Sequence, residues 1–287
     1  MRGPGLLRIG ELSRRSGVSP ELLRAWERRY QLLQPARSQG GLRLYSLADL
    51  ERVRLMQQHL ERGLAAAEAA ALATEQPAPS GAEMLTDAEE ELADALMAFD
   101  EARAHVVLDS LLASATIDTV LVTVVMPYLH ELGARWERGD ASVAQEHFAT
   151  AVLRGRLLGL ARGWGRGLGP PIVLACAPGE EHDLGLIAFG LALRGRGWRI
   201  VYLGADTPLT SVADAAHAST AVFAAVSAVT PKPFQENRDE LRALARSQRL
   251  CLGGAGAAAA ALDVDAEILS GDPVQEAERL TAVLETR

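Results

Sequence analysis

The spacing of hydrophobic and polar positions divides the chain into three stretches. From residue 6 to 73, apolar side chains recur every three or four positions, which is the period of amphipathic helices. The same period runs from about residue 83 to residue 162. Beyond residue 171, short continuous apolar runs alternate with stretches of helical period. This alternation is typical of buried parallel strands joined by helices.

The third stretch therefore predicts a parallel, doubly wound α/β sheet, Rossmann-like and of the flavodoxin type. Its predicted strands are residues 172–177, 199–204, 221–228 and 250–254, with a weaker fifth strand at 266–271. Its predicted helices are residues 184–196, 208–218, 234–247 and 273–285.

Two breaks in the pattern, both rich in proline or glycine, set the predicted domain boundaries. We expect a helical domain at 1–73, a linker at 74–82, a central four-helix bundle at 83–165 and the α/β domain at 166–287. The fold class is thus multidomain, α followed by α/β.

Composition and charge narrow the classes of function. Hydrophobic residues make up 48% and charged residues 23% of the 287, which is a globular composition. The net charge is −8, but residues 1–62 hold 12 Arg against 6 Asp plus Glu, a net charge of +6. The rest of the chain is therefore strongly acidic. A basic head on an acidic body indicates one domain that faces phosphate and another with a different task.

The remaining compositional features predict a cytoplasmic protein. No apolar run reaches the roughly 18–20 residues of a membrane-spanning helix, so we expect no membrane contact. No signal peptide is recognisable at the N-terminus. The two cysteines, Cys176 and Cys251, lie in predicted buried strands, which disfavours a disulfide framework.

The basic head carries the pattern of a helix-turn-helix. A short helix ends at Gly17, and Ser19 and Pro20 are a typical N-cap and first residue of a second helix. We expect this second helix to bury one apolar face, formed by Leu22, Leu23, Trp26 and Tyr30. Its arginines would then meet phosphates or base edges in a major groove.

A Gly-Gly hairpin with interleaved Arg and Tyr follows at residues 35–45 and is typical of a wing. Residues 6–72 together resemble the winged helix-turn-helix of MerR-type transcription regulators. The resemblance implies a set of contacts to double-stranded operator DNA: Arg24, Arg28, Arg29, Arg37, Arg43 and Tyr45.

The strongest chemical signal follows the first predicted strand of the α/β domain. His182 lies between Glu180 and Asp183 in a loop at the carboxyl end of that strand, where open parallel sheets bind ligands. One ring nitrogen of such a histidine can bind a metal while a carboxylate orients the other nitrogen. The spacing does not choose between the two carboxylates.

Three short motifs extend this signal across the sheet. They are Glu180-x-His182-x-x-Gly185, Ser227-Ala-Val229 and the pair Gly253-Gly254. Together they resemble the cobalamin-binding domain of methionine synthase and related proteins. The resemblance implies that His182 is the lower cobalt ligand and that the cofactor's nucleotide tail enters the sheet past the serine and the glycines, where a Cβ would fill its path.

Trp136 and the pair Glu146-His147 resemble a motif of CarH-like photoreceptors, which join a MerR-type reader to a helical bundle and a cobalamin domain. The resemblance implies that Trp136 caps the adenosyl group of adenosylcobalamin and that Glu146 and His147 lie near its upper side; methylcobalamin is a second form. It also implies a repressor that assembles as a dimer or tetramer and leaves DNA when light breaks the carbon–cobalt bond. One departure is Glu137, where light-sensing members have a histidine that binds cobalt after photolysis.

Three other interpretations stay open at this point. A light-independent cobalamin sensor would have the same architecture, and Glu137 favours it. A corrinoid methyl carrier or mutase module would explain the second and third stretches but not the groove-reading helix. A MerR-type sensor of metals or drugs would place cysteines beside the dimer helix, where this chain has none. We therefore expect a regulator and not an enzyme.

Overall fold

The computed structural model describes residues 7–37, 43–75, 81–166, 169–260 and 263–285. The chain forms two compact units, Met1–Asp94 with Ala102–Thr116, and Ala95–Glu101 with Ile117–Arg287. This division differs from the predicted boundaries, because helices of the central stretch are shared between the two units. Helices cover both ends of the stretch predicted as a linker, 74–82, because α-helices reach Glu75 and resume at Gly81; residues 76–80 lie outside the described part.

The N-terminal part of the first unit has the expected winged helix-turn-helix order. Its elements are α1 (Ile9–Ser16), α2 (Pro20–Tyr30), β1 (Ala36–Arg37), β2 (Arg43–Leu44), α3 (Leu47–Glu61) and α4 (Ala66–Glu75). Gly17 ends α1 with a φ of 70°, and the Ser19 hydroxyl accepts the Leu22 N–H at the start of α2. Strands β1 and β2 pair antiparallel to form the base of the wing.

One face of α2 closes the core of this domain. Leu23 and Trp26 are buried and Tyr30 is partly buried, at the helical spacing i, i+3, i+7. The expectation that Leu22 belongs to this face is wrong, because its side chain is 44% exposed. Leu22 lies about 100° around the helix from Leu23, which places it on the flank of the buried stripe.

The central stretch is helical throughout, as predicted. Its helices are α5 (Gly81–Met97), α6 (Glu101–Ser114), α7 (Ile117–Val120), the π-helix η1 (Leu121–Val125), α8 (Met126–Arg138) and α9 (Val143–Leu160). The chain reverses between α8 and α9: Gly139 ends α8 with a φ of 79°, and Ser142 starts α9 in a capping box with Gln145. Four of these helices are long: α5, α6, α8 and α9. Helices α8 and α9 belong to the second unit, whereas most of α5 and of α6 belongs to the first.

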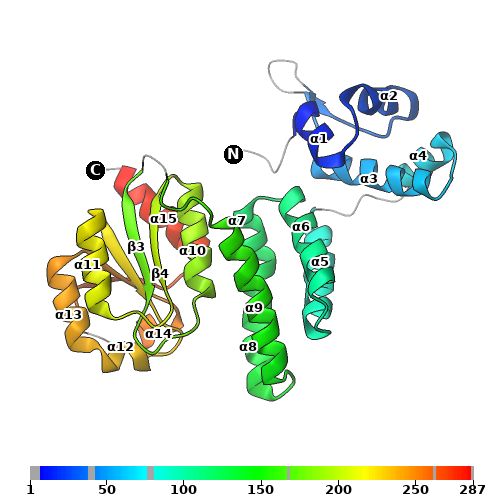
Figure 1. Ribbon diagram of the computed structural model, residues 1–287. Helices are drawn as coiled ribbons and strands as arrows, with labels where there is room; N and C mark the ends of the chain where they lie inside the picture. The colour runs from blue at the N-terminus through cyan, green and yellow to red at the C-terminus, as the bar shows by residue number, and fades with distance from the viewer. Residues whose placement is uncertain (1–6, 38–42, 76–80, 167–168, 261–262, 286–287) are drawn as a thin grey trace. The chain divides into compact units, whose positions relative to one another are not determined.

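The second unit contains the predicted sheet. All five strands are parallel, in the order β4-β3-β5-β6-β7, which is the flavodoxin order (Figure 1). The strands are β3 (Pro171–Cys176), β4 (Arg199–Gly204), β5 (Phe223–Ser227), β6 (Leu250–Gly253) and β7 (Ala266–Leu269). The weak fifth strand is thereby confirmed.

Helices cover both faces of this sheet. Helices α10 (Leu184–Gly195) and α15 (Pro273–Glu285) lie on one face, and α11 (Leu209–Ser219) and α13 (Arg238–Ser247) lie on the other (Figure 1). Two short helices, α12 (Lys232–Glu236) and α14 (Ala255–Ala259), differ from the expected pattern. The predicted helix at 234–247 is thus two helices, and α14 was not predicted because five residues are too few to show a period. Within the described residues, no helix combines the length and apolar character that a membrane span requires.

The order of the strands fixes where a ligand would bind. From β3 the chain moves to the edge strand β4 and then returns to β5 on the other side of β3. The loops that leave the carboxyl ends of β3 and β5 therefore diverge, and this switch point is where open α/β sheets hold their ligands. The loop with His182 follows β3.

The paired glycines at the end of β6 have different structural roles. A Cβ on Gly254 would lie 2.4 Å from the carbonyl oxygen of Ala228, and its φ is 84°. A Cβ on Gly253 would meet only side-chain atoms of Leu269, the nearest at 3.8 Å. The backbone therefore requires a glycine at position 254 and tolerates a side chain at position 253.

We expect Gly254→Ala to lower the free energy of unfolding of the sheet domain by about 2–3 kcal/mol, because alanine is strained at this φ and clashes with the end of β5. The matched Gly253→Ala should change it by about 1 kcal/mol or less. Urea unfolding followed by tryptophan fluorescence measures both. Equal losses in the two variants would contradict this assignment.

Candidate cofactor site and DNA interface

A buried carboxylate organises the loop after β3. The Glu180 side chain is 4% exposed, and its Oε1 accepts the backbone N–H of His182 at 2.8 Å. The same oxygen is 2.6 Å from His182 Nδ1, and Oε2 accepts the N–H of Val229 at 2.7 Å. Glu180 therefore joins the loop after β3 to the loop after β5. Of the two carboxylates left open by the sequence, Glu180 is the one that holds the imidazole.

This bond fixes which nitrogen of His182 is available. A carboxylate only accepts hydrogen bonds, so Nδ1 carries the proton in the Glu180 pair. The neutral ring then has its lone pair on Nε2. The His182 side chain is 67% exposed, so this nitrogen is open to a ligand at the switch point of the sheet.

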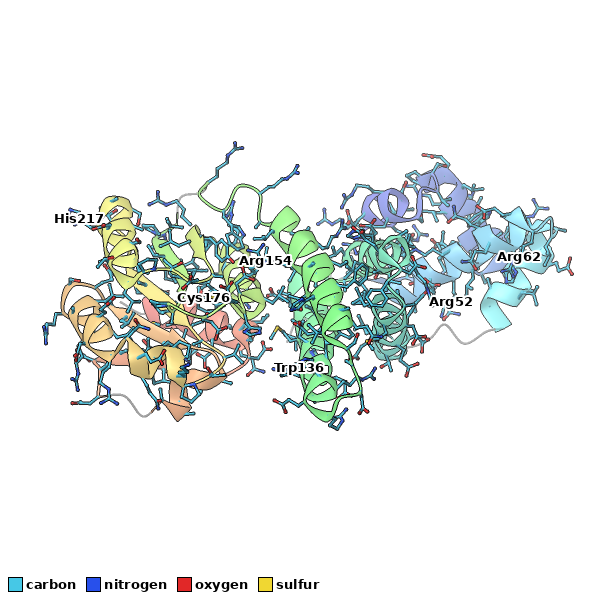
Figure 2. The ribbon with its side chains drawn as sticks, turned by 60° about the horizontal axis from the view of Figure 1, so that its bottom comes forward. Arg52, Arg62, Trp136, Arg154, Cys176 and His217 are labelled. Carbon is cyan, nitrogen blue, oxygen red and sulfur yellow. The ribbon has the colours of Figure 1, made fainter. Side chains whose placement is uncertain are left out.

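Asp183, the residue after the histidine, faces a different partner. It is 2% exposed and accepts Arg154 Nε and Nη2 from α9, at 2.9 and 2.8 Å. It also accepts the Tyr202 hydroxyl of β4 at 2.5 Å. In Figure 2, Arg154 projects from α9 toward the end of the sheet where Cys176 is labelled. Asp183 thus connects the helical pair α8–α9 to the α/β layer.

The charges of this cluster follow from its contacts. The bond to Asp183 raises the pKa of Arg154. Burial, and then the hydrogen bond to Asp183, raise the pKa of Tyr202 far above its usual range. Tyr202 therefore stays a hydrogen-bond donor at any physiological pH. Arg154 stays a cation.

The other residues of the α/β domain that were expected at the site also lie near the carboxyl ends of the strands. Ser227 is the last residue of β5, and its hydroxyl is 3.5 Å from the Cys176 sulfur. Val229 gives its N–H to Glu180 and leaves its side chain exposed. Gly185 lies in the first turn of α10, where an added Cβ would meet nothing within 4 Å. Internal packing therefore does not explain why position 185 is glycine.

The helical motif is carried by the α8–α9 hairpin. Trp136 lies in the last turn of α8 with its side chain 52% exposed. Glu146 lies in the first turn of α9 and accepts the Thr150 hydroxyl, and His147 beside it is largely exposed. Glu146, Thr150 and Arg154 follow one another at four-residue spacing, so they share one face of α9.

The recognition helix presents the predicted basic surface. Arg24, Arg28 and Arg29 of α2 are exposed. Among the residues that the structure describes, none of the three forms an ion pair, and Arg29 lies over the ring of Tyr30. The side chain of Arg37 and the wing tip, residues 38–42, are outside the described part.

The wing requires a correction. We expected Tyr45 to contact DNA, but its side chain is fully buried and its hydroxyl donates to Glu27 Oε2 of α2 at 2.8 Å. Arg43 Nε is 3.0 Å from the other oxygen of Glu27, with half of its side chain exposed. Tyr45 is therefore a core residue that joins the wing to the recognition helix. Sequence reasoning missed Glu27, whose only signal was a single carboxylate in the middle of a basic helix.

Comparison with known proteins agrees with this architecture. The MerR HTH family regulatory protein model matches residues 7–76, and a B12 binding domain model matches residues 88–158. The HTH-type transcriptional repressor CarH of Myxococcus xanthus is 34% identical over 266 residues, which cover 87% of this chain and 89% of CarH. The chain belongs to the CarH family of MerR-type regulators.

Other comparisons are consistent with the CarH family. The repressor CarA of the same organism is 33% identical over 258 residues, covering 88% of this chain and 87% of CarA. The monomethylamine corrinoid protein of Methanosarcina barkeri has a TM-score of 0.59 at 17% identity, covering 69% of this chain and 99% of its own. That likeness shows a shared fold. The family confirms the expectation of a transcription regulator that is not an enzyme.

In this CarH-family chain, Arg28 of the recognition helix and Tyr45 of the wing give opposite predictions. Arg28→Met should weaken binding to operator DNA and reduce the salt dependence by about one phosphate contact, without changing stability. Tyr45→Phe should instead cost about 1 kcal/mol of stability, because it removes a buried hydrogen bond. Titration of labelled DNA at several salt concentrations, together with thermal unfolding, measures both. A stable Tyr45→Phe protein that loses as much DNA affinity as Arg28→Met would restore Tyr45 as a DNA contact.

The two buried cysteines, Cys176 and Cys251, give a prediction about the reactivity of their thiols. Burial raises the pKa of Cys176 to about 12 and that of Cys251 to about 12. Both thiols therefore stay protonated, and the thiolate is the reactive form. We expect neither to react with an aromatic disulfide reagent at about pH 8 in the folded chain. Both should react in denaturing urea. Rapid modification of either thiol in the folded chain would contradict the burial.

Proposed function

We propose that this protein represses transcription by binding operator DNA while its sensor carries adenosylcobalamin, and that light releases it. The observation that carries the proposal is the Glu180–His182 pair, which presents one imidazole nitrogen at the switch point of the sheet. The MerR-type DNA-binding domain on the same chain would let this sensor act on transcription.

The residues present fit such a cofactor. Cobalt in a corrin ring brings its equatorial ligands with it, so the protein needs to supply one axial donor. His182 offers that donor, and Glu180 is the second-layer carboxylate that such histidines commonly have. Among the described residues, no group of three or more His, Cys, Asp or Glu side chains could hold a metal ion.

The upper side of the cofactor would be covered by the α8–α9 hairpin. Trp136 exposes half of a large aromatic surface, which suits stacking against an adenosyl group. Glu146 and His147 would contact the same side. Ser227, Val229 and the glycines at positions 185, 253 and 254 would line the path of the nucleotide tail.

Light sensitivity would come from the cofactor, whose carbon–cobalt bond breaks on absorption of visible light. The protein would then have to couple the presence of the upper cobalt ligand to the assembly of several chains. A ligand that binds the assembled state more tightly shifts the population toward it, and linked readers then bind DNA multivalently. Loss of the group that Trp136 covers would remove this preference.

A light-independent cobalamin regulator is the second candidate. Glu137 favours it, because this exposed carboxylate follows Trp136 where light-sensing relatives place a histidine. The departure concerns the state after illumination, since binding of adenosylcobalamin does not depend on this position.

The deciding experiment is size-exclusion chromatography with absorbance at the corrin bands. We expect the chain with adenosylcobalamin in the dark to elute as a coloured oligomer, and green light to shrink it. His182→Ala should remain folded and lose its coordination-dependent corrin spectrum, because the lower donor is absent. Operator binding, measured on the same fractions, should follow the oligomer.

Each other outcome selects an alternative. A coloured oligomer whose size does not change with light would favour the light-independent regulator. Wild-type protein that retains no corrin would overturn the cofactor assignment and leave a DNA-binding regulator with an unknown signal. Methylcobalamin in place of adenosylcobalamin serves as the matched control for the upper group.

A further inference from the structure

The helix α9 is attached to the α/β layer at two places. At its C-terminal end, Trp164 in the following turn is buried, stacks edge-on against Tyr202 at 5.3 Å, and its carbonyl accepts the N–H of Ile200. Ten residues earlier, Arg154 binds Asp183. Arg154 lies six residues, about 9 Å of helix, before the end of α9 at Leu160, and Trp164 follows beyond that end, so the two attachments hold the helix at separate points.

The Arg154–Asp183 attachment differs from the first in its exposure. Asp183 is almost completely buried, whereas the Arg154 side chain is 43% exposed. If α9 moved, Arg154 could be hydrated at little cost, while Asp183 would keep the Tyr202 hydroxyl as a partner. The pair can therefore separate without leaving a buried carboxylate unpartnered, which is the costly case.

Asp183 is also placed beside the proposed cobalt ligand. It follows His182 directly and occupies the N-cap position of α10, yet its side chain makes no capping bond to that helix. Its oxygens are used for Arg154 and Tyr202 instead. The loop that holds His182 is thus tied to β5 through Glu180 and to α9 through Asp183.

The face of α9 that carries Arg154 also carries Thr150 and Glu146, one and two turns nearer its N-terminus. Fixing Arg154 on Asp183 fixes the height of this face relative to the His182 loop. In the proposed function this face covers the upper side of the cofactor, so its height would set the room for an upper group.

We propose that Arg154 is a positioning residue: by clamping α9 to Asp183 it sets the sensor's preference for a cobalamin with a large upper group over one with a small upper group. The inference rests on the proposed function. Arg154 itself need not touch the cofactor, because it acts through the placement of α9.

A second ion pair provides a matched control. Arg196, at the C-terminal end of α10, binds Asp118 of α7 at 2.9 Å. It too joins the helical elements to the α/β layer, but it lies at the end of α10 opposite to His182. Arg196→Met removes the same charge and a similar ion pair as Arg154→Met.

The test compares the affinities for adenosylcobalamin and cyanocobalamin in the dark. Arg154→Met should weaken binding of adenosylcobalamin about tenfold, the loss expected for one charge-assisted contact, and weaken cyanocobalamin less than about twofold. Arg154→Lys should fall between, since lysine keeps the charge but not the forked geometry. Arg196→Met should change neither. Equal losses for the two cobalamins, or equal effects of the two Met variants, would overturn the proposal.

Hydrogen–deuterium exchange of the cofactor-free chain separates this inference from the proposed function. The amides of α9 up to Arg154 should exchange faster in Arg154→Met than in Arg196→Met. If wild-type protein binds no cobalamin, the proposed function fails, and this measurement still decides whether Arg154 positions α9. Unchanged exchange would refute the clamp. Asp183→Asn, which keeps the side-chain shape, replaces Arg154→Met if that variant does not fold.

Discussion

A carboxylate in the interior of a protein is costly unless its oxygens receive hydrogen bonds, and this requirement shapes the sensor around Glu180. The buried side chain receives the N–H groups of His182 and Val229 and the Nδ1–H of the imidazole. Those donors come from the loops after β3 and β5, which diverge at the switch point of the sheet. The hydrogen bonds to Glu180 therefore hold the loop after β3 in place and join it to the loop after β5. They also leave Nε2 as the free nitrogen of His182.

A second buried carboxylate, Asp183, lies three residues later and binds a different set of partners. Asp183 is satisfied by Arg154 and Tyr202, so it takes no part in orienting the imidazole. The same short loop thereby contacts the sheet through one side chain and the helical hairpin through the other. The winged helix-turn-helix contains a comparable arrangement, in which Glu27 of α2 binds Tyr45 and Arg43 of the wing. In each case a carboxylate joins two elements and fixes their spacing.

Much of this architecture could be predicted from the sequence because it depends on local or periodic signals. The strands of the sheet are continuous apolar runs, and the start of α2 is marked by Ser19 and Pro20. The assignment of Glu180 and Asp183 could not be predicted, since both lie within hydrogen-bonding reach of His182 along the chain. Their partners Val229 and Arg154 come from distant segments. Tyr45 was misplaced for the same reason: an aromatic residue in a basic wing is compatible with DNA contact until the position of Glu27 is known.

The uneven charge of the chain bears on how a sensor of this kind could control DNA binding. Residues 1–62 carry a net charge of +6 while the whole chain carries −8, so the residues after position 62 have a net negative charge that, taken as a whole, repels phosphate. At physiological salt this repulsion is screened beyond about 8 Å, which lets an acidic body lie near DNA without adding affinity. Assembly of several chains would therefore raise affinity through the number of linked readers and not through new basic surface. Under that constraint, the DNA affinity of a single chain would depend on the exposed arginines of α2, which form no ion pair within the described residues.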